Sequence, residues 1–169
     1  RRRERLVICV RRAPEVRIFN AFTGQFVRSF YAFNADFRGG VFVATGDVNG
    51  DHVADIITGM GAGTASRPFV RAVKGLTRQQ LFQVRDYAPG FTGGVRVAAA
   101  DFNNDGIADI ITAPGAGIPT KIRGLDSTKL TNNDYTVTPD DDETTDDFNE
   151  NDDELFNFNA YDESFLGGA

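Results

Sequence analysis

Two short segments of the sequence carry oxygen-bearing side chains at matching positions. The first is Asp47-Val48-Asn49-Gly50-Asp51-His52-Val53-Ala54-Asp55, and the second is Asp101-Phe102-Asn103-Asn104-Asp105-Gly106-Ile107-Ala108-Asp109. Each has carboxylates or an amide at positions 1, 3, 5 and 9. A hard cation such as Ca²⁺ binds about six to eight oxygen atoms, and a tightly wound loop directs alternate side chains inward. The spacing therefore predicts two calcium-binding loops.

The predicted ligands are the side chains at positions 1, 3, 5 and 9 and the backbone carbonyl at position 7. They are Asp47, Asn49, Asp51, Val53 and Asp55 in the first loop, and Asp101, Asn103, Asp105, Ile107 and Asp109 in the second. The alternative is a pair of metal-free turns, because Asp and Asn also stabilise turns on their own. Three carboxylates in one loop repel one another without a cation, which favours the metal.

The loops do not meet the requirements of an EF-hand. That motif needs a bidentate Glu at position 12 and a helix on each side. Position 12 is Thr58 in the first segment and Thr112 in the second, and the flanking residues have no helical pattern. Position 6 of such a loop favours a positive φ, which Gly106 adopts more easily than His52. The second loop is therefore expected to bind calcium more tightly.

The two loops belong to a longer internal repeat. Residues 39–63 and 93–117, offset by 54, are identical at 16 of 25 positions. Upstream, Phe33-x-x-x-Phe37-x-Gly39-Gly40 corresponds to Tyr87-x-x-x-Phe91-x-Gly93-Gly94, and a third copy, Tyr161-x-x-x-Phe165-x-Gly167-Gly168, lies near the end of the sequence. The chain thus contains at least part of three copies of one unit.

Each unit has the pattern of four short β-strands. In the first period they are expected at 16–19, 26–30, 41–45 and 55–58, where apolar residues alternate between turn residues. Four antiparallel strands in a repeat of about 40–50 residues are typical of a β-propeller blade. The predicted fold is therefore all-β, with about three four-stranded antiparallel blades of a partial propeller, and a parallel β-helix is the alternative.

The repeat also predicts how the chain is divided. Residues 1–13 match nothing in the unit, and the units are placed at 14–67, 68–118 and 119–169. The last unit is longer by an acidic insertion at 132–154, which holds eleven Asp and Glu residues and is expected to be a solvated loop.

Composition excludes several other classes of protein. Residues 1–130 hold all 18 Lys and Arg, but these are scattered and form no basic stripe, so no nucleic-acid partner is expected. No apolar stretch is long enough for a membrane span. The single cysteine, Cys9, cannot form an internal disulfide, and His52 is the only histidine, so no hydrolase triad can be assembled. The chain is expected not to be an enzyme.

The loops, the Phe-x-Gly-Gly element and the Gly-Ala-Gly element together resemble the FG-GAP or VCBS-type repeat of integrin α-subunit propellers and large bacterial surface proteins. The resemblance covers about residues 14–130 and 156–169. It implies that the loop aspartates bind calcium and that the propeller serves adhesion or the recognition of proteins or glycans. It also implies a secreted or cell-surface protein, and further repeats or other copies would complete the propeller.

Two other functions remain open at the level of sequence. The chain could be the non-catalytic propeller of a secreted carbohydrate-active enzyme, although no convergent set of Tyr, His, Arg and carboxylates is visible outside the loops. It could also be a component of a surface layer or filament in which neighbouring chains complete one another's blades, because two full units are fewer than the roughly four to eight blades that close a propeller.

Overall fold

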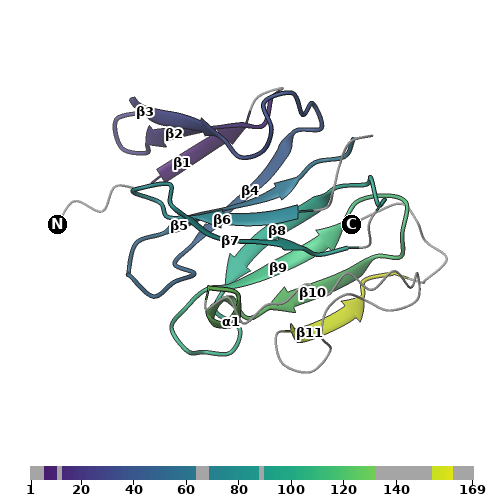
Figure 1. Cartoon of the computed structure of the whole chain (residues 1–169). Helices are drawn as coiled ribbons and strands as arrows, with labels where there is room; N and C mark the ends of the chain where they lie inside the picture. Colours follow the sequence, from purple (N-terminus) through teal and green to yellow (C-terminus); the bar gives the residue numbers. More distant parts are fainter. Residues whose placement is uncertain (1–5, 11–12, 64–68, 88–89, 132–153, 162–169) are drawn as a thin grey trace.

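The described residues form three antiparallel β-sheets that follow one another along the chain (Figure 1). The structure is a computed structural model that describes residues 6–10, 13–63, 69–87, 90–131 and 154–161. These residues form eleven strands and one short helix. The prediction of an all-β chain built from four-stranded antiparallel blades is confirmed.

The first sheet has three strands, β1 (Leu6–Val10), β2 (Glu15–Asn20) and β3 (Phe26–Tyr31), in that order. A turn joins β2 to β3, and the side-chain oxygen of Asn20 accepts hydrogen bonds from two backbone N–H groups in that turn. Gly24 closes the turn with a φ of 68°, in the left-handed region that favours glycine.

The second sheet is a four-stranded meander. Its strands, β4 (Val41–Gly46), β5 (Asp55–Met60), β6 (Phe69–Val73) and β7 (Gln80–Arg85), are hydrogen-bonded in sequence order. Every residue of β5 is buried because both faces of this strand are covered, one by the first sheet and one by the third. The second sheet therefore forms the middle layer of the described molecule.

The third sheet repeats this meander with β8 (Val95–Ala100), β9 (Asp109–Pro114), β10 (Lys121–Leu125) and β11 (Glu154–Asn159). The acidic insertion predicted at 132–154 falls between β10 and β11, and all of it except Glu154 lies outside the described residues. The two flanking strands still pair in antiparallel register. The insertion thus interrupts a hairpin without removing its second strand.

A short helix, α1 (Ser127–Thr131), follows β10 and is not predicted by the sequence pattern. The Asp126 carboxylate accepts a hydrogen bond from the backbone N–H of Thr128 at 2.9 Å, which satisfies one of the open donors of the first turn. Leu130 is buried in the core between the second and third sheets. Tertiary burial of this leucine, rather than local propensity, accounts for the helix.

The four strands expected in the first period are confirmed as β2, β3, β4 and β5. They do not form one sheet, however, because β2 and β3 belong to the first sheet and β4 and β5 to the second. The sheets therefore run out of phase with the units placed at 14–67, 68–118 and 119–169. A repeat has no intrinsic starting point, and sequence similarity alone does not reveal which four consecutive strands are hydrogen-bonded together.

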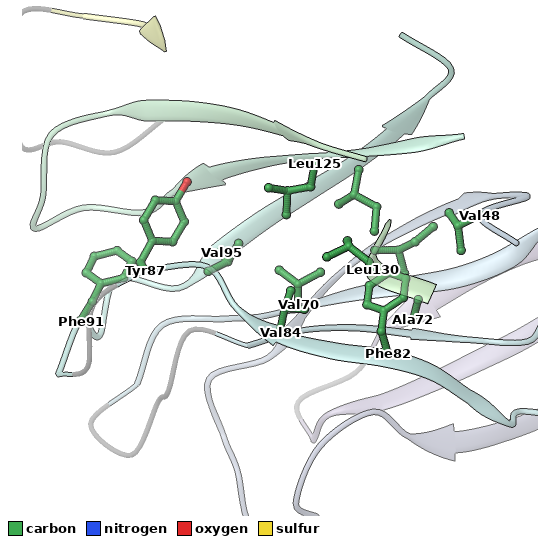
Figure 2. Close-up of a cluster of buried hydrophobic side chains, with 12 residues drawn as sticks. Val48, Val70, Ala72, Phe82, Val84, Tyr87, Phe91, Val95, Leu125 and Leu130 are labelled. Atoms are coloured by element: carbon green, nitrogen blue, oxygen red, sulfur yellow. The ribbon is translucent and has the colours of Figure 1, made fainter. Parts of the chain in front are cut away.

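Two apolar cores separate the three sheets. The core between the first and second sheets includes Val16 and Ile18 from β2 with Ile56 and Met60 from β5. The core between the second and third sheets is larger, and Figure 2 shows its side chains converging from both sheets and from α1. Its buried members are Val48, Ile57, Val70, Ala72, Phe82, Val84, Tyr87, Phe91, Val95, Ile110, Leu125 and Leu130.

The glycine-rich elements pack backbone against backbone on the Gly-Gly pair of their own repeat. The N–H of Gly61 donates to the Gly40 carbonyl at 3.0 Å, and the N–H of Gly115 donates to the Gly94 carbonyl at 2.8 Å. A Cβ built on Gly61 or Gly115 would lie within about 2 Å of a backbone oxygen, which leaves no space for a side chain. The Gly63 N–H also donates to the carbonyl of Thr92 in the next repeat. Gly61 and Gly115 therefore serve close packing within their own repeats, and Gly63 contacts the neighbouring repeat.

Candidate metal-binding loops

The first candidate loop joins β4 to β5 and is organised around the carboxylate of Asp47. Its Oδ1 accepts hydrogen bonds from the N–H groups of Gly50 at 2.8 Å and Asp51 at 3.2 Å, and its Oδ2 accepts one from His52 at 2.7 Å. The amide of Asn49 donates to Asp55 Oδ2 at 2.5 Å. The structure thus brings four of the predicted ligand residues into one hydrogen-bonded loop.

The second candidate loop joins β8 to β9 and has the same scaffold. Oδ1 of Asp101 accepts from the N–H of Asp105 at 3.2 Å, and its Oδ2 accepts from Gly106 at 2.9 Å. The Asn103 side-chain oxygen accepts from the Asp105 N–H at 3.0 Å. In both loops, therefore, the position-1 aspartate binds the N–H groups of positions 5 and 6.

The predicted carbonyl ligands at position 7 occupy equivalent places. The N–H of Val53 donates to Asp51 Oδ1 at 3.0 Å, and the N–H of Ile107 donates to Asp105 Oδ1 at 2.8 Å. Both residues are half-buried. The hydrogen bond holds the chain in the tight turn from which the carbonyl of position 7 could act as an oxygen ligand.

The aspartates at position 9 are the most buried of the predicted ligands. Asp55 begins β5 and Asp109 begins β9, and both are fully buried. Burial raises the pKa of each carboxyl above its ordinary value, although backbone N–H groups oppose the shift. The carboxylate of Asp55 accepts hydrogen bonds from Val48 and Gly75, and that of Asp109 accepts one from Phe102. A nearby cation would stabilise the charged form of either residue.

Both loops need two residues in the left-handed region. His52 has a φ of 62° and Gly106 a φ of 88°, which confirms the positive φ expected at position 6. Position 4 shares this conformation, because Gly50 has a φ of 75° and Asn104 a φ of 61°. Each loop thus carries one glycine and one residue with a side chain at these two positions.

The two loops lie side by side in space. The N–H of Ala108 in the second loop donates to the carbonyl of Asp47 in the first at 2.8 Å. A Cβ on Gly46 would come within 2.8 Å of the Ala108 side chain. The loops therefore gather at the same end of neighbouring sheets, which places two sets of carboxylates on one part of the surface.

The carboxylates of one loop are held apart by these internal hydrogen bonds. Among the described residues, no three Asp, Glu, His or Cys side chains converge closely enough to hold a metal ion between them. The donor set itself consists of carboxylate, amide and carbonyl oxygens, which suits a hard cation such as Ca²⁺. The chemistry of the loops therefore fits calcium. To bind it, the carboxylates would need to rotate away from the backbone N–H groups that they now accept hydrogen bonds from.

Two residues outside the predicted set contact the first loop. Lys74 Nζ lies 3.4 Å from Oδ2 of Asp51, and the N–H of Gly75 donates to Oδ1 of Asp55 at 3.2 Å. Both come from the turn that follows β6, 20 or more residues further along the sequence. The sequence around Lys74 and Gly75 does not indicate that they contact the loop, because the contact depends on how β6 pairs with β5.

The comparison with protein families matches one stretch of the chain. Residues 93–129 match the family model of the FG-GAP repeat, a stretch that runs from β8 through the second loop and β9 to β10 and into α1. The chain carries an FG-GAP repeat. An FG-GAP repeat suggests an integrin-like extracellular β-propeller module. No curated protein and no solved structure in the comparisons matches the chain.

Residues 39–63 of the first unit share the loop and flanking strands of this FG-GAP repeat at the 16 identical positions noted above. The two units also share the hydrogen-bond scaffold of the loop. No helix in the described part of the chain is long and apolar enough to cross a membrane.

Proposed function

We propose that the chain is a calcium-stabilised structural and recognition module of a secreted or cell-surface protein, with one calcium ion in each of the two loops. The ligands would be the side-chain oxygens at positions 1, 3, 5 and 9 and the carbonyl at position 7. Calcium would supply the positive charge that balances three carboxylates in each loop. The chain would serve adhesion or the binding of an extracellular protein or glycan and has no catalytic step of its own.

The duplicated loop is the observation that best supports this proposal. Asp47 and Asp101 accept hydrogen bonds from the same two backbone positions of their loops, although the residues between them differ. The buried carboxyl groups of Asp55 and Asp109 support it further, because burial opposes their ionisation and a cation would favour it. A simple polar turn also has the first feature, but it does not need the second.

The affinity range of extracellular calcium modules supports an extracellular location. Extracellular calcium modules bind with dissociation constants of about 10⁻⁴–10⁻³ M, which millimolar calcium outside the cell is sufficient to occupy. The FG-GAP match at residues 93–129 agrees with this location.

Thermal unfolding with and without a calcium chelator tests the proposal. If each loop binds only in the folded state with a dissociation constant of about 10⁻⁴ M, about 10 mM Ca²⁺ stabilises the fold by about 2.7 kcal/mol per site. For a domain of this size, each kcal/mol corresponds to roughly 2–4 °C in Tm. We therefore expect the chelator to lower Tm by several degrees, and added Ca²⁺ to restore it better than Mg²⁺ does.

Matched variants separate the loops from general charge effects. Replacing Asp47 and Asp101 by Ala together should abolish the response to calcium. Asp36→Ala is the control, because Asp36 is an exposed acid outside both loops. An unchanged Tm after chelation of the original chain would refute the calcium proposal.

A further inference from the structure

The two repeats place residues of opposite charge at one equivalent point next to their candidate loops. Val73 ends β6 and Leu125 ends β10, and they pair with the equivalent second residues of β5 and β9. The next residue along the chain is Lys74 in the first repeat and Asp126 in the second. The sequence offset of 54 relates Lys74 to Thr128 instead, so this equivalence is visible only in the register of the strands.

The lysine contacts a predicted calcium ligand of the first loop. Nζ of Lys74 lies 3.4 Å from Oδ2 of Asp51, the residue at position 5, and both side chains are partly exposed. The turn that carries the lysine is fixed on two sides. The Gly75 N–H donates to Oδ1 of Asp55 at 3.2 Å, and the guanidinium of Arg28 in β3 donates to the Gly75 carbonyl. The ammonium group is therefore held beside the loop, where it balances part of the charge of the carboxylates.

The acid at the same point in the second repeat lies close to the second loop. Asp126 is 7% exposed, and its Oδ1 accepts hydrogen bonds from the N–H of Thr128 at 2.9 Å and from the Thr128 hydroxyl at 2.6 Å. Burial is the main cause of the raised pKa of Asp109, backbone N–H groups that include that of Ser127 oppose the shift, and the charge of Asp126 adds to it. Among the described residues, neither Asp126 nor Lys129 of α1 forms an ion pair. The second loop therefore has a fourth acid beside it.

The formal charges of the two sites differ for this reason. Three carboxylates and one ammonium give the first loop and its turn a charge of −2, and four carboxylates give the second loop and its turn a charge of −4. Calcium loops tune their affinity through the charge of the groups round the ion. In the first loop the ion must also displace the ammonium from Asp51 or remain close to a like charge. Both effects disfavour calcium in the first loop relative to the second.

We propose that Lys74 and Asp126 set the order in which the two loops take up calcium. Lys74 is a built-in competitor that weakens the first loop, and Asp126 strengthens the second loop without being one of its predicted ligands. The second loop then fills at a lower calcium concentration than the first. This inference rests on the proposed function, because it concerns the same two sites.

Calorimetric titration of a single-loop variant tests the lysine. Asp101→Ala leaves the first loop as the calcium site, and in that background Lys74→Met should tighten binding by about three- to tenfold, because it removes the competing charge. Lys74→Gln repeats the measurement with a polar neutral side chain. Lys74→Arg keeps the charge and should leave the affinity within about twofold. Lys129→Met is the matched control, because it removes a lysine that forms no ion pair with a described residue, and it should also leave the affinity within about twofold.

The acid is tested in the opposite background. Asp47→Ala leaves the second loop as the calcium site, and there Asp126→Asn should weaken binding by about three- to tenfold. Asn retains the oxygen that accepts the hydrogen bonds of Thr128, so the start of α1 is preserved. Asp36→Asn, at an exposed acid outside both loops, should have no measurable effect.

Stability without calcium separates this role of the lysine from a purely structural one. Lys74→Met should lower the Tm of the calcium-free chain slightly, because Asp51 loses its partner, while it raises the affinity for calcium. A substitution that merely loosens the loop would lower both the Tm and the affinity. Circular dichroism verifies that each variant is folded.

Two results would overturn the inference, and they differ in what they mean for the proposed function. The charge at this point does not set the affinity if calcium binds both single-loop variants but either Lys74→Met or Asp126→Asn leaves the affinity of its loop unchanged. The calcium proposal would survive that result. If the original chain binds no calcium at millimolar concentrations, both the inference and the proposed function are refuted.

Discussion

At the scale of residues, the aspartate at position 1 organises each loop by accepting backbone hydrogen bonds. Asp47 and Asp101 each bind the N–H groups of positions 5 and 6, and this curls the chain so that positions 3, 5 and 9 follow round the same turn. The curl requires positive φ at positions 4 and 6, and the left-handed region costs a residue with a side chain roughly 1–2 kcal/mol. Asn and His enter it more easily than most residues.

The first prediction concerns this strain. His52→Gly should stabilise the folded chain by about 0.5–1 kcal/mol, because glycine adopts the φ of 62° without strain. The larger entropy that glycine loses on folding offsets part of this gain. Asn104→Gly should have an effect of similar sign in the second loop. Urea unfolding at fixed calcium concentration measures both changes. Backbone strain should therefore make the two loops differ little in calcium affinity, although Gly106 by itself would favour the second loop. Each loop has one residue with a side chain at a positive φ, His52 in the first and Asn104 in the second.

Ala54→Gly is the control for these substitutions. Ala54 lies in the first loop but not at a positive φ, so glycine there should lower stability by up to about 1 kcal/mol. Equal destabilisation by His52→Gly and Ala54→Gly would contradict the role assigned to backbone strain.

At the scale of elements, the packing of β5 against β8 holds the second and third sheets together. A Cβ added to Gly59 in β5 would lie 2.1 Å from the Val95 carbonyl oxygen and 3.0 Å from the side chain of Val97. Because Val95 contributes a backbone atom, the clash cannot be relieved by a rotamer change. The close approach of these strands also holds the two candidate loops beside each other.

The second prediction follows from this contact. Gly59→Ala should destabilise the chain by about 3 kcal/mol or more, at or above the upper end of what overpacking usually costs. Gly24→Ala is the comparison, because Gly24 has a positive φ but open space around it, and it should cost only about 1 kcal/mol. Chemical unfolding of both variants checks the difference, and equal losses would show that the sheets can separate to accommodate a methyl group.

The elements differ in how much of them could be predicted from sequence. The strands β2, β3, β4 and β5 follow from the alternation of apolar residues and from turn glycines, which act locally. The helix α1 could not be predicted, because it depends on the burial of Leu130 between two sheets. The contacts of Lys74 and Gly75 with the first loop could not be predicted for the same reason, since they join residues 20 or more apart and depend on the pairing of β6 with β5.

At the scale of the whole molecule, the repeat predicts blades but not where each blade begins. The similarity between residues 39–63 and 93–117 shows that the pattern recurs every 54 residues. This period is the same whichever four consecutive strands are taken as one blade. Hydrogen bonding decides the choice, and it places the start of a sheet at β4 and again at β8. The loops consequently lie between the first two strands of each four-stranded sheet, where neighbouring sheets are close.

The central claim is that both loops bind calcium, and the stoichiometry of binding tests it most directly. Calorimetric titration of the calcium-free chain should give two calcium ions per chain. Asp47→Ala and Asp101→Ala should each leave one, and the double variant should leave none. No bound calcium at millimolar concentrations, or two ions bound by the folded double variant, would contradict the account.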